Sequence, residues 1–194
     1  EIRNGAGPVI YLTKDVYEYR GSYSSGVYVY GSNVIIDGQG CTIDGKNSAR
    51  HFNINSGYSN ITFRNINFIN AKVNYYGESG DKYYTLKYEN GGAILGYSTC
   101  INCKFINNYA TNAGAMHNGT AIGCTFINNT AFDGGAISGN CSAVNCIFIN
   151  STASYGGAIS GGSAVNCTFI NNIAKEHGLK PIIKLASVQT AKRI

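Results

Sequence analysis

The chain has 194 residues, a formal net charge of +5 and 13 % charged residues, against about 25 % in an ordinary soluble domain. This length fits one domain with a complete hydrophobic core. In residues 175–194, five basic side chains accompany one acidic side chain, so residues 1–174 sum to about +1. This distribution provides no basic stripe and argues against nucleic-acid binding. The uncharged, Gly- and Tyr-rich composition fits an extracellular or cell-surface location better than a cytosolic one.

The first seventy residues contain several short runs of strand-forming residues. Val9–Leu12, Val27–Tyr30 and Val34–Ile36 are rich in β-branched and aromatic side chains and are bounded by turn-forming residues. Asp37 and Asp44 each precede a glycine. We therefore interpret these two carboxylates as turn residues and not as a catalytic pair.

Residues 71–90 form the most aromatic and polar stretch of the chain. They lengthen one interval of the repeat described below by about 15 residues, so we predict a loop that protrudes from the body of the protein. Exposed tyrosines can stack on sugar rings or anchor a protein partner. The alternative is that the loop folds against the body and buries its own aromatic rings. The candidate ligand-binding residues are Tyr75, Tyr76, Tyr83, Tyr84 and Tyr88.

Residues 91–174 repeat one pattern four times. Its core is Cys-x-Phe-Ile-Asn, and successive Phe residues are 21, 22 and 21 positions apart. A second motif, Gly-Gly-Ala-Ile or a close variant, follows the first in phase. The distance from Phe to the Gly before Ala is always 9 residues, whereas the arc from that Gly to the next Cys has 10 or 11. Because the variable arc contains Gly96, Asn118–Gly119, Gly139–Asn140 and Gly161–Gly162, we place a corner there.

A period near 22 residues without proline is too short for two helices and indicates a solenoid of short strands. The alternation in Ile101–Phe105 has the period of one strand and places Cys and Phe on the inner face. Equivalent residues of stacked coils should lie about 4.8 Å apart. The predicted inner columns are Cys103, Cys124, Cys146 and Cys167; Phe105, Phe126, Phe148 and Phe169; and Ala110, Ala131, Ala153 and Ala174. A buried asparagine ladder is predicted at Asn107, Asn128, Asn150 and Asn171.

These patterns predict an all-β fold: a parallel β-helix of short stacked strands, with about seven coils and a length near 35 Å. Residues 1–30 would form an N-terminal cap and a first irregular coil, because a solenoid end exposes core and unpaired strand edges. Residues 31–174 would form the β-helix, with the loop 71–90 inserted. Residues 175–194 would form a C-terminal tail, either a helical cap or the point at which a longer solenoid is cut.

Phe-x-x-Asn combined with Gly-Gly-Ala-Ile at this spacing resembles the repeat of polymorphic outer-membrane and adhesin-like surface proteins. The resemblance is greatest to the right-handed parallel β-helix regions of adhesin-like proteins from methanogenic archaea. Ile10–Asp15 and Val34–Gly45 resemble the way in which such domains open, so the similarity covers roughly residues 9 to 174. It implies that the fold is a single-stranded, right-handed parallel β-helix of the pectate-lyase type, and it implies a cell-surface role. The β-helix class also contains pectin-degrading and other polysaccharide enzymes, so fold alone does not decide function.

The seven cysteines are odd in number, so at least one is unpaired or pairs with another chain. The four repeat cysteines would have parallel Cα–Cβ vectors, which is poor disulfide geometry. We interpret them as free thiols that pack as small hydrophobic side chains. Cys41, Cys100 and Cys141 are placed off that column. Cys100 and Cys103 have zinc-like spacing but no second pair, so we expect no metal.

Candidate catalytic residues are few. A hydrolase or lyase on this fold needs carboxylates gathered on one face, yet residues 91–174 contain one acidic residue, Asp133. His51, His117 and His177 form no Ser-His-Asp arrangement. The sequence contains no phosphate loop or redox motif, so no cofactor is expected. No apolar run approaches the roughly 18 residues of a membrane span, and an export signal or anchor is expected outside these residues.

We therefore expect a non-enzymatic segment of a cell-surface adhesin-like protein. It would be a rigid, monomeric rod that displays loops, above all residues 71–90, to a glycan or a cell-surface partner, with no membrane contact of its own. The alternative is a polysaccharide-active enzyme, a lyase or a glycoside hydrolase, which three carboxylates within about 6 Å over a groove would favour. A third possibility is a structural stalk without a ligand.

Overall fold

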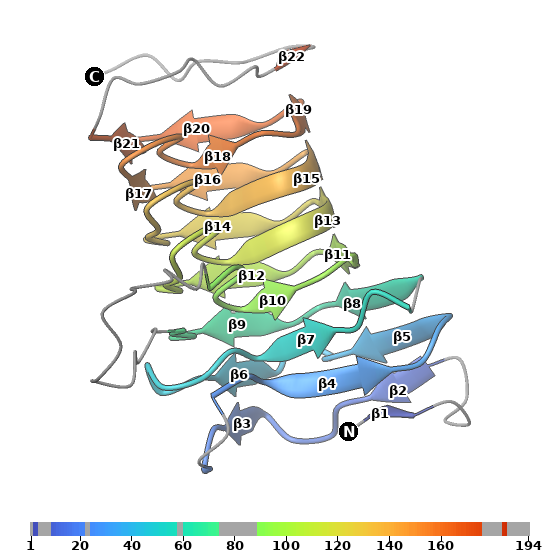
Figure 1. Ribbon diagram of the computed structural model, residues 1–194. Coiled ribbons are helices and arrows are strands. Elements are labelled where there is room, and N and C mark those ends of the chain that lie inside the picture. The colour runs from blue at the N-terminus through green and yellow to red at the C-terminus, as the bar shows by residue number, and fades with distance from the viewer. Residues whose placement is uncertain are drawn as a thin grey trace.

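The computed structural model describes residues 2–3, 9–21, 24–57, 60–73, 89–175 and 184–185, and these residues contain strands but no helix. Short parallel strands stack one above another along a single axis, so the chain winds as a parallel β-solenoid (Figure 1). Within the described residues, the strands form sheets of thirteen, seven and two strands. The seven-stranded sheet receives one strand from each coil, so the solenoid has about seven turns, as predicted.

The seven-stranded sheet forms one wall of the solenoid, and the side chain of the middle residue in each of its strands points inward. There the predicted phenylalanine column is confirmed: neighbouring rings from Phe68 to Phe169 stack with centroids between 4.7 and 5.0 Å apart. Ile43 and Tyr17 extend this column toward the N-terminus in register. The strands of this wall are β3 (Val16–Glu18), β6 (Thr42–Asp44), β9 (Asn67–Ile69), β12 (Lys104–Ile106), β14 (Thr125–Ile127), β16 (Ile147–Ile149) and β20 (Thr168–Ile170).

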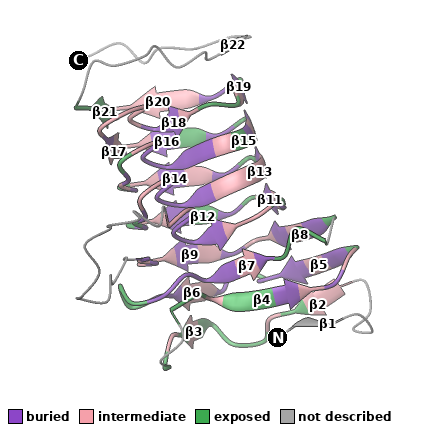
Figure 2. Cartoon of the chain, in the orientation of Figure 1, coloured by how far each residue is buried: buried purple, intermediate pink, exposed green. Residues whose placement is uncertain are grey.

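The thirteen-stranded sheet supplies two further walls, which merge where β13 (Met116–Ile122) and β15 (Ile137–Val144) run through both. The first of these walls contains β1 (Ile2–Arg3), β4 (Val27–Tyr30), β7 (Phe52–Ile54), β10 (Ile94–Leu95) and β18 (Ile159–Ser160). The second contains β2 (Val9–Tyr11), β5 (Val34–Asp37), β8 (Ile61–Arg64), β11 (Thr99–Ile101), β19 (Ser163–Val165) and β22 (Lys184–Leu185). A small sheet of β17 (Thr152–Ala153) and β21 (Ile173–Ala174) lies between walls. Buried residues follow the inner side of the strands in each wall (Figure 2).

The arc of variable length is a corner, as predicted from its Gly and Asn residues. The pairing of β13 with β15 shifts register between His117 and Gly119, because β15 contains one more residue at this point. Gly119 has φ 105° and Gly139 has φ 82°, which are values that most other residues avoid. A single inserted residue is therefore absorbed at the corner without disturbing the stacked walls.

The Gly-Gly-Ala motif marks the closest approach of neighbouring coils. A Cβ atom placed on Gly135 would lie 2.0 Å from the carbonyl oxygen of Gly157 in the next coil. The equivalent contact between Gly114 and Gly135 would be 2.3 Å. The second Gly of the motif is thus needed because the backbone of the adjacent coil occupies the space that any side chain would take.

The prediction of one continuous strand over Ile101–Phe105 is wrong. Asn102 has φ 51° and separates β11 from β12, and Asn145 and Asn166 take the same conformation in later coils. The inward placement of Cys103 and Phe105 is nevertheless correct. The left-handed residue turns the chain at a corner. Inward and outward side chains still alternate within the strand on each side of that turn.

The buried asparagine ladder lies one residue later than predicted. Asn107, Asn128, Asn150 and Asn171 are exposed turn residues with φ between 52° and 56°. The buried positions are Asn108, Asn129, Ser151 and the half-buried Asn172. Asn108 Nδ2 donates to the Phe68 carbonyl (3.1 Å) and its Oδ1 accepts from the Ala71 N–H (2.9 Å). The left-handed turn residue rotates the chain, so the side chain that follows it points inward.

All seven cysteines are free and buried. The expectation that Cys41 lies off the cysteine column is wrong, because pairing of β6, β9 and β12 places Cys41, Ile66 and Cys103 in one row. Its coil lacks the Phe of the repeat and carries Ile43 instead, so the sequence spacing did not reveal the equivalence. Ala174 stays in register with Ala153 but is exposed, unlike the other members of its predicted column.

The ends of the chain are described in part. β2, β3 and β4 pair in parallel with β5, β6 and β7, so these three strands are stacked on the next coil in the same order. In the tail, Lys184 and Leu185 form a strand that pairs with β19. The rest of the tail and residues 74–88 lie outside the described residues, so the predicted division into cap, β-helix and tail remains a prediction.

Candidate functional site

The tyrosines predicted to bind a ligand, Tyr75, Tyr76, Tyr83, Tyr84 and Tyr88, all lie outside the described residues. Residues 71–73 and 89–90, at the two ends of the insertion, are described. Lys72 pairs with Tyr109, and Asn90 pairs with Asn112. Both partners belong to one coil, so Lys72 and Asn90, near the two ends of the insertion, pair with the same neighbouring coil.

Arg50 fastens the end of the insertion to the first two coils. Its side chain is 3 % exposed, and its Nη2 contacts Glu89 Oε2 (3.0 Å) and the Asn90 carbonyl (2.9 Å). Nε donates to the Gly91 carbonyl (3.0 Å), and Nη1 donates to the Ser25 carbonyl (3.4 Å). Burial lowers the pKa of Arg50, and the Glu89 carboxylate opposes this shift. One buried guanidinium therefore joins three segments that are distant in the sequence.

A pocket of about 420 Å³ lies beside Arg50, between the first and second coils. We call it the first-coil pocket. Tyr17 forms part of its wall, and the Tyr17 hydroxyl accepts hydrogen bonds from the N–H groups of Thr13 (2.9 Å) and Lys14 (3.1 Å), which hold the ring in place. The lining residues are Tyr17, Glu18, Tyr19, Arg20, Gly21, Gly26, Val27, Ile43, Asp44, Gly45, Arg50 and His51.

His51 provides an uncharged part of the pocket lining. It is 5 % exposed, its ring packs 5.5 Å from that of Phe68, and its Nε2 lies 3.1 Å from the Ile69 carbonyl oxygen. A carbonyl accepts, so Nε2 carries the proton, and Nδ1 has no hydrogen-bond partner among the described residues. Burial lowers the pKa of His51 to about 4, so the ring is neutral at pH 7.

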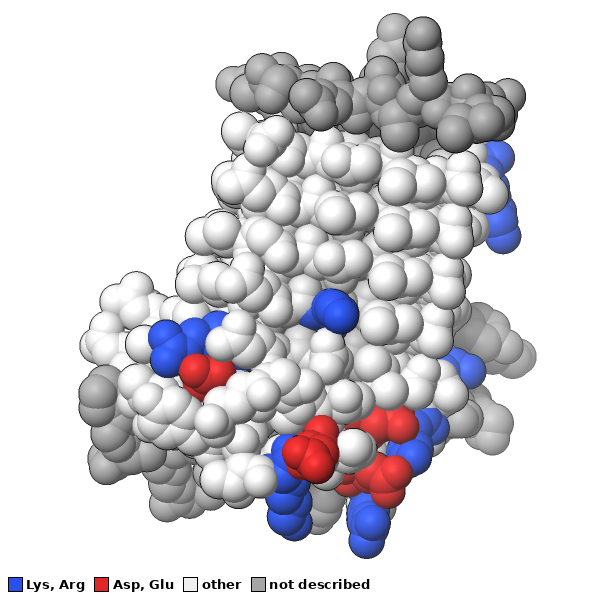
Figure 3. Space-filling view, turned by 180° about the vertical axis from the view of Figure 1, so that it is seen from behind, with Lys and Arg blue, Asp and Glu red and all other residues white. Residues whose placement is uncertain are grey.

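The rim of the pocket carries charges that are paired with one another. Lys46 Nζ lies 2.6 Å from Glu18 Oε1 and 3.2 Å from Asp44 Oδ2, and Arg20 Nη2 lies 3.4 Å from Glu18 Oε2. The hydrogen bond and charge of Lys46 lower the pKa of Glu18. Acidic and basic side chains gather over the N-terminal coils, and the wall beyond them is nearly uncharged (Figure 3).

The two turn carboxylates have the role that the sequence predicted. Burial alone would raise the pKa of Asp44, but the Lys46 N–H, the Asn70 amide and the Lys46 ammonium together lower it. The Asp37 carboxylate is held by similar contacts: Oδ1 accepts from the Gln39 N–H (3.0 Å), and Oδ2 accepts from Arg64 Nε (2.8 Å). Both groups are therefore ionised hydrogen-bond acceptors.

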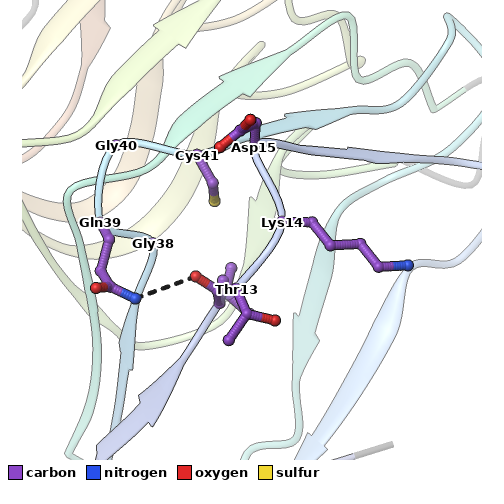
Figure 4. A pocket seen from close by; sticks show the side chains of 8 residues that line it. Thr13, Lys14, Asp15, Gly38, Gln39, Gly40 and Cys41 are labelled. Atoms are coloured by element: carbon purple, nitrogen blue, oxygen red, sulfur yellow. Dashed lines mark hydrogen bonds between the residues drawn. The ribbon is translucent and has the colours of Figure 1, made fainter.

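A second pocket, of about 480 Å³, lies where the turn 12–15 stacks on the turn 38–41 (Figure 4). Gln39 Nε2 donates to the Leu12 carbonyl (3.2 Å) and ties the turns together. Figure 4 shows the Cys41 sulfur between the two turns and the Lys14 side chain directed away from them. Burial, followed by the Asp37 charge, raises the pKa of Cys41. The sulfur is therefore a protonated thiol and not an activated nucleophile.

Sequence reasoning did not anticipate the first-coil pocket. Its walls come from segments with irregular spacing that lack the Gly-Gly-Ala motif, and the Arg50–Glu89 pair joins residues 39 positions apart. The available signal was the tyrosine-rich link that holds Tyr17 and Tyr19 between two strand runs. Within the described part of the chain, no cluster of His, Cys, Asp and Glu has the geometry for a metal ion.

Comparisons of the chain with protein-family models, with curated proteins and with solved structures found no match. The described residues include no helix that is long and apolar enough to cross a membrane.

Proposed function

We propose that this chain is a non-enzymatic segment of a cell-surface adhesin-like protein, a stiff spacer that displays recognition elements to a glycan or a cell-surface partner. The observation that carries the proposal is the unbroken register of the coils from β9 to β20. Rings from Phe68 to Phe169 stack in one row, with interplanar angles between 4° and 18°. Such a row resists bending, because any tilt between coils separates rings that are in contact.

The backbone and the asparagine ladder add stiffness along the same axis. Each coil donates main-chain hydrogen bonds to its neighbours, for example Asn107 N to Ile127 O (3.0 Å). Inside the corner, Asn129 Nδ2 donates to the Phe105 carbonyl (2.9 Å), and Asn129 Oδ1 accepts from the Asn108 N–H (3.0 Å). Hydrogen bonds buried in a dry interior are costly to open, which favours a rod that transmits force without unfolding.

The state of the carboxylates supports a non-enzymatic role over the alternative of a polysaccharide lyase or hydrolase. A glycosidase needs a carboxylic acid whose pKa is raised so that it can protonate the leaving group. Glu18 and Asp44 are in register on adjacent coils, but Lys46 binds both and their pKa values are lowered. They are therefore deprotonated at neutral pH and already engaged with a cation.

The low surface charge and the burial of the thiols are compatible with the extracellular location that we propose. Residues 91–174 carry Lys104 and Asp133 as their only charged side chains, and the seven cysteines are free. Buried, protonated thiols react slowly with disulfides and oxidants, because the thiolate is the reactive form. The adhesin-like assignment itself comes from the resemblance of the repeats.

The proposal is tested with the whole chain in two assays. Incubation with pectin, cellulose, xylan and chitin should release no reducing ends or unsaturated products, while a glycan array should show binding. Release of either product above the buffer control would contradict the proposal and favour the enzyme. Binding to no glycan and to no cell surface would favour a stalk without a ligand.

A further inference from the structure

The first-coil pocket combines aromatic, aliphatic and polar groups in a small volume. Tyr17 and Tyr19 bring two aromatic rings to it, beside Val27 and Ile43. Tyr17 is held by two backbone N–H groups, so its ring does not have to be ordered when a ligand binds. A preformed cavity with a few polar groups is the usual form of a small-molecule site.

The charges around this pocket satisfy one another. Lys46 bridges Glu18 and Asp44, Arg20 supplies a second positive charge beside Glu18, and Arg50 is paired with Glu89. A charged ligand would have to break one of these pairs to gain its own partner, whereas a neutral ligand would not. The remaining acceptor positions of the carboxylates stay available for hydroxyl groups.

We propose that the first-coil pocket is a binding subsite for one residue of a neutral saccharide. The apolar C–H face of the sugar packs on the rings of Tyr17 and Tyr19, and its hydroxyl groups bind Glu18, Asp44 and Arg20 at the rim. This inference rests on the proposed recognition function, but it places binding between the first two coils and not in the tyrosine-rich insertion.

The pocket lies beside the end of the insertion that we expect to take part in recognition of a partner. Its Arg50 wall is bonded to Glu89 and Asn90, the last two residues of the insertion, and to Gly91, which follows it. The pocket and the point at which the insertion re-enters the wall therefore lie on one rigid support. A saccharide bound here would be held near Glu89 and Asn90, the C-terminal end of the insertion that the sequence marks for recognition.

The first experiment follows the imidazole NMR resonances of His51 in the whole chain while simple sugars are added. The probes are the methyl glycosides of glucose, galactose and mannose, N-acetylglucosamine, and glucuronate as the charged comparison. Because His51 lines the pocket, we expect saturable shifts with at least one neutral sugar. Shifts with glucuronate alone, or with no sugar, would overturn the inference.

The second experiment measures binding of variants on the glycan array. Tyr19→Ala removes a ring from the pocket, and Val27→Trp fills the pocket from a position that is 41 % exposed. Each should weaken binding by about tenfold or more. Tyr11→Ala, in the same coil but outside the pocket lining and 56 % exposed, is the matched control and should bind as the wild type does. Unchanged thermal melting midpoints would show that the variants are folded.

The outcomes separate this inference from the proposed function. Wild-type binding that survives Tyr19→Ala and Val27→Trp but is lost in the double variant Tyr83→Ala and Tyr84→Ala would overturn the pocket and leave the proposed function standing. Cleavage of a polysaccharide together with His51 shifts would overturn the non-enzymatic function and leave the subsite standing. Wild-type protein that binds no saccharide in either assay would overturn the subsite, and the proposed function would fall with it only if the protein also bound no cell surface.

Discussion

The N-terminal coils and the C-terminal coils share one path but differ in what their side chains do. Residues 9–73 carry ten charged side chains, whereas residues 91–174 carry two. In one inner row, Ile36 and Phe63 of the N-terminal coils give way to Cys100 and then to alanines, from Ala121 onward. Where the coils repeat, main-chain hydrogen bonds and columns of like side chains hold neighbouring coils together. Where the coils differ, specific side-chain contacts join them, and both pockets lie among these N-terminal coils.

The largest expected effect concerns the phenylalanine column of the regular coils. Phe148 is fully buried between two stacked rings, so Phe148→Ala should lower the free energy of unfolding by about 3–5 kcal/mol. Tyr17→Ala, in the same column of the first coil but half-buried, should cost less. Urea melts measure both. Lys104→Ala, next to the column but exposed, should be nearly neutral, and a cost equal to that of Phe148→Ala would contradict the assignment of inside and outside.

A second prediction compares two glycines. Gly135→Ala in the regular coils should cost about 3 kcal/mol, because the new Cβ would meet the Gly157 carbonyl oxygen of the next coil. Gly40→Ala in the second coil has no heavy atom within 4 Å of the new Cβ and should cost only the strain of its φ of 93°, about 1–2 kcal/mol. Thermal and urea melts would show the difference. Equal costs would mean that coil contact does not set the need for Gly135.

A third prediction uses the buried His51 of the N-terminal coils. Its folded pKa of about 4 lies below the ordinary value of 6.5, so the unfolded chain binds the proton first as the pH falls. The contribution of the neutral His51 to the free energy of unfolding is complete above pH 6.5 and is lost as the pH falls toward 4. Between pH 7.5 and pH 5 the loss should be about 2 kcal/mol.

Urea melts of wild type and His51→Gln at the two pH values measure this effect. The pKa of His117 is also lowered by burial, so the wild-type slope contains both residues and the difference between the two proteins isolates His51. Equal slopes for the two proteins would contradict the burial of a neutral imidazole at this position.

The smallest expected effect is a gain. Ser151 stands in the buried asparagine row and is 0 % exposed, and its hydroxyl has no partner within the described residues. Ser151→Asn should restore the bonds that Asn129 makes one coil earlier and raise stability by about 1–2 kcal/mol. The reciprocal change Asn129→Ser should lower stability by a similar amount. Loss of stability in Ser151→Asn would show that the corner lacks room for the amide.

The repeat spacing predicted which residues stack, but it did not decide which neighbouring residue turns inward. The columns of Phe105 and Cys103 followed from the spacing alone. The asparagine ladder was placed one residue early, because the left-handed turn at Asn107 reverses the alternation that a simple strand would keep. Cys41 was missed because its coil departs from the repeat, and only strand pairing placed it in the row.

The solenoid, its period and the corner that accepts insertions can be derived from the repeat alone, because a short apolar unit repeated at a fixed interval is buried by stacking on its neighbours. The first-coil pocket depends on three-dimensional packing. Arg50 meets Glu89 because β7 and β10, which follow these two residues, pair in neighbouring coils, and Lys46 meets Glu18 because two irregular coils align. Pairing between non-repeating coils depends on how they pack, and no spacing in the sequence encodes it.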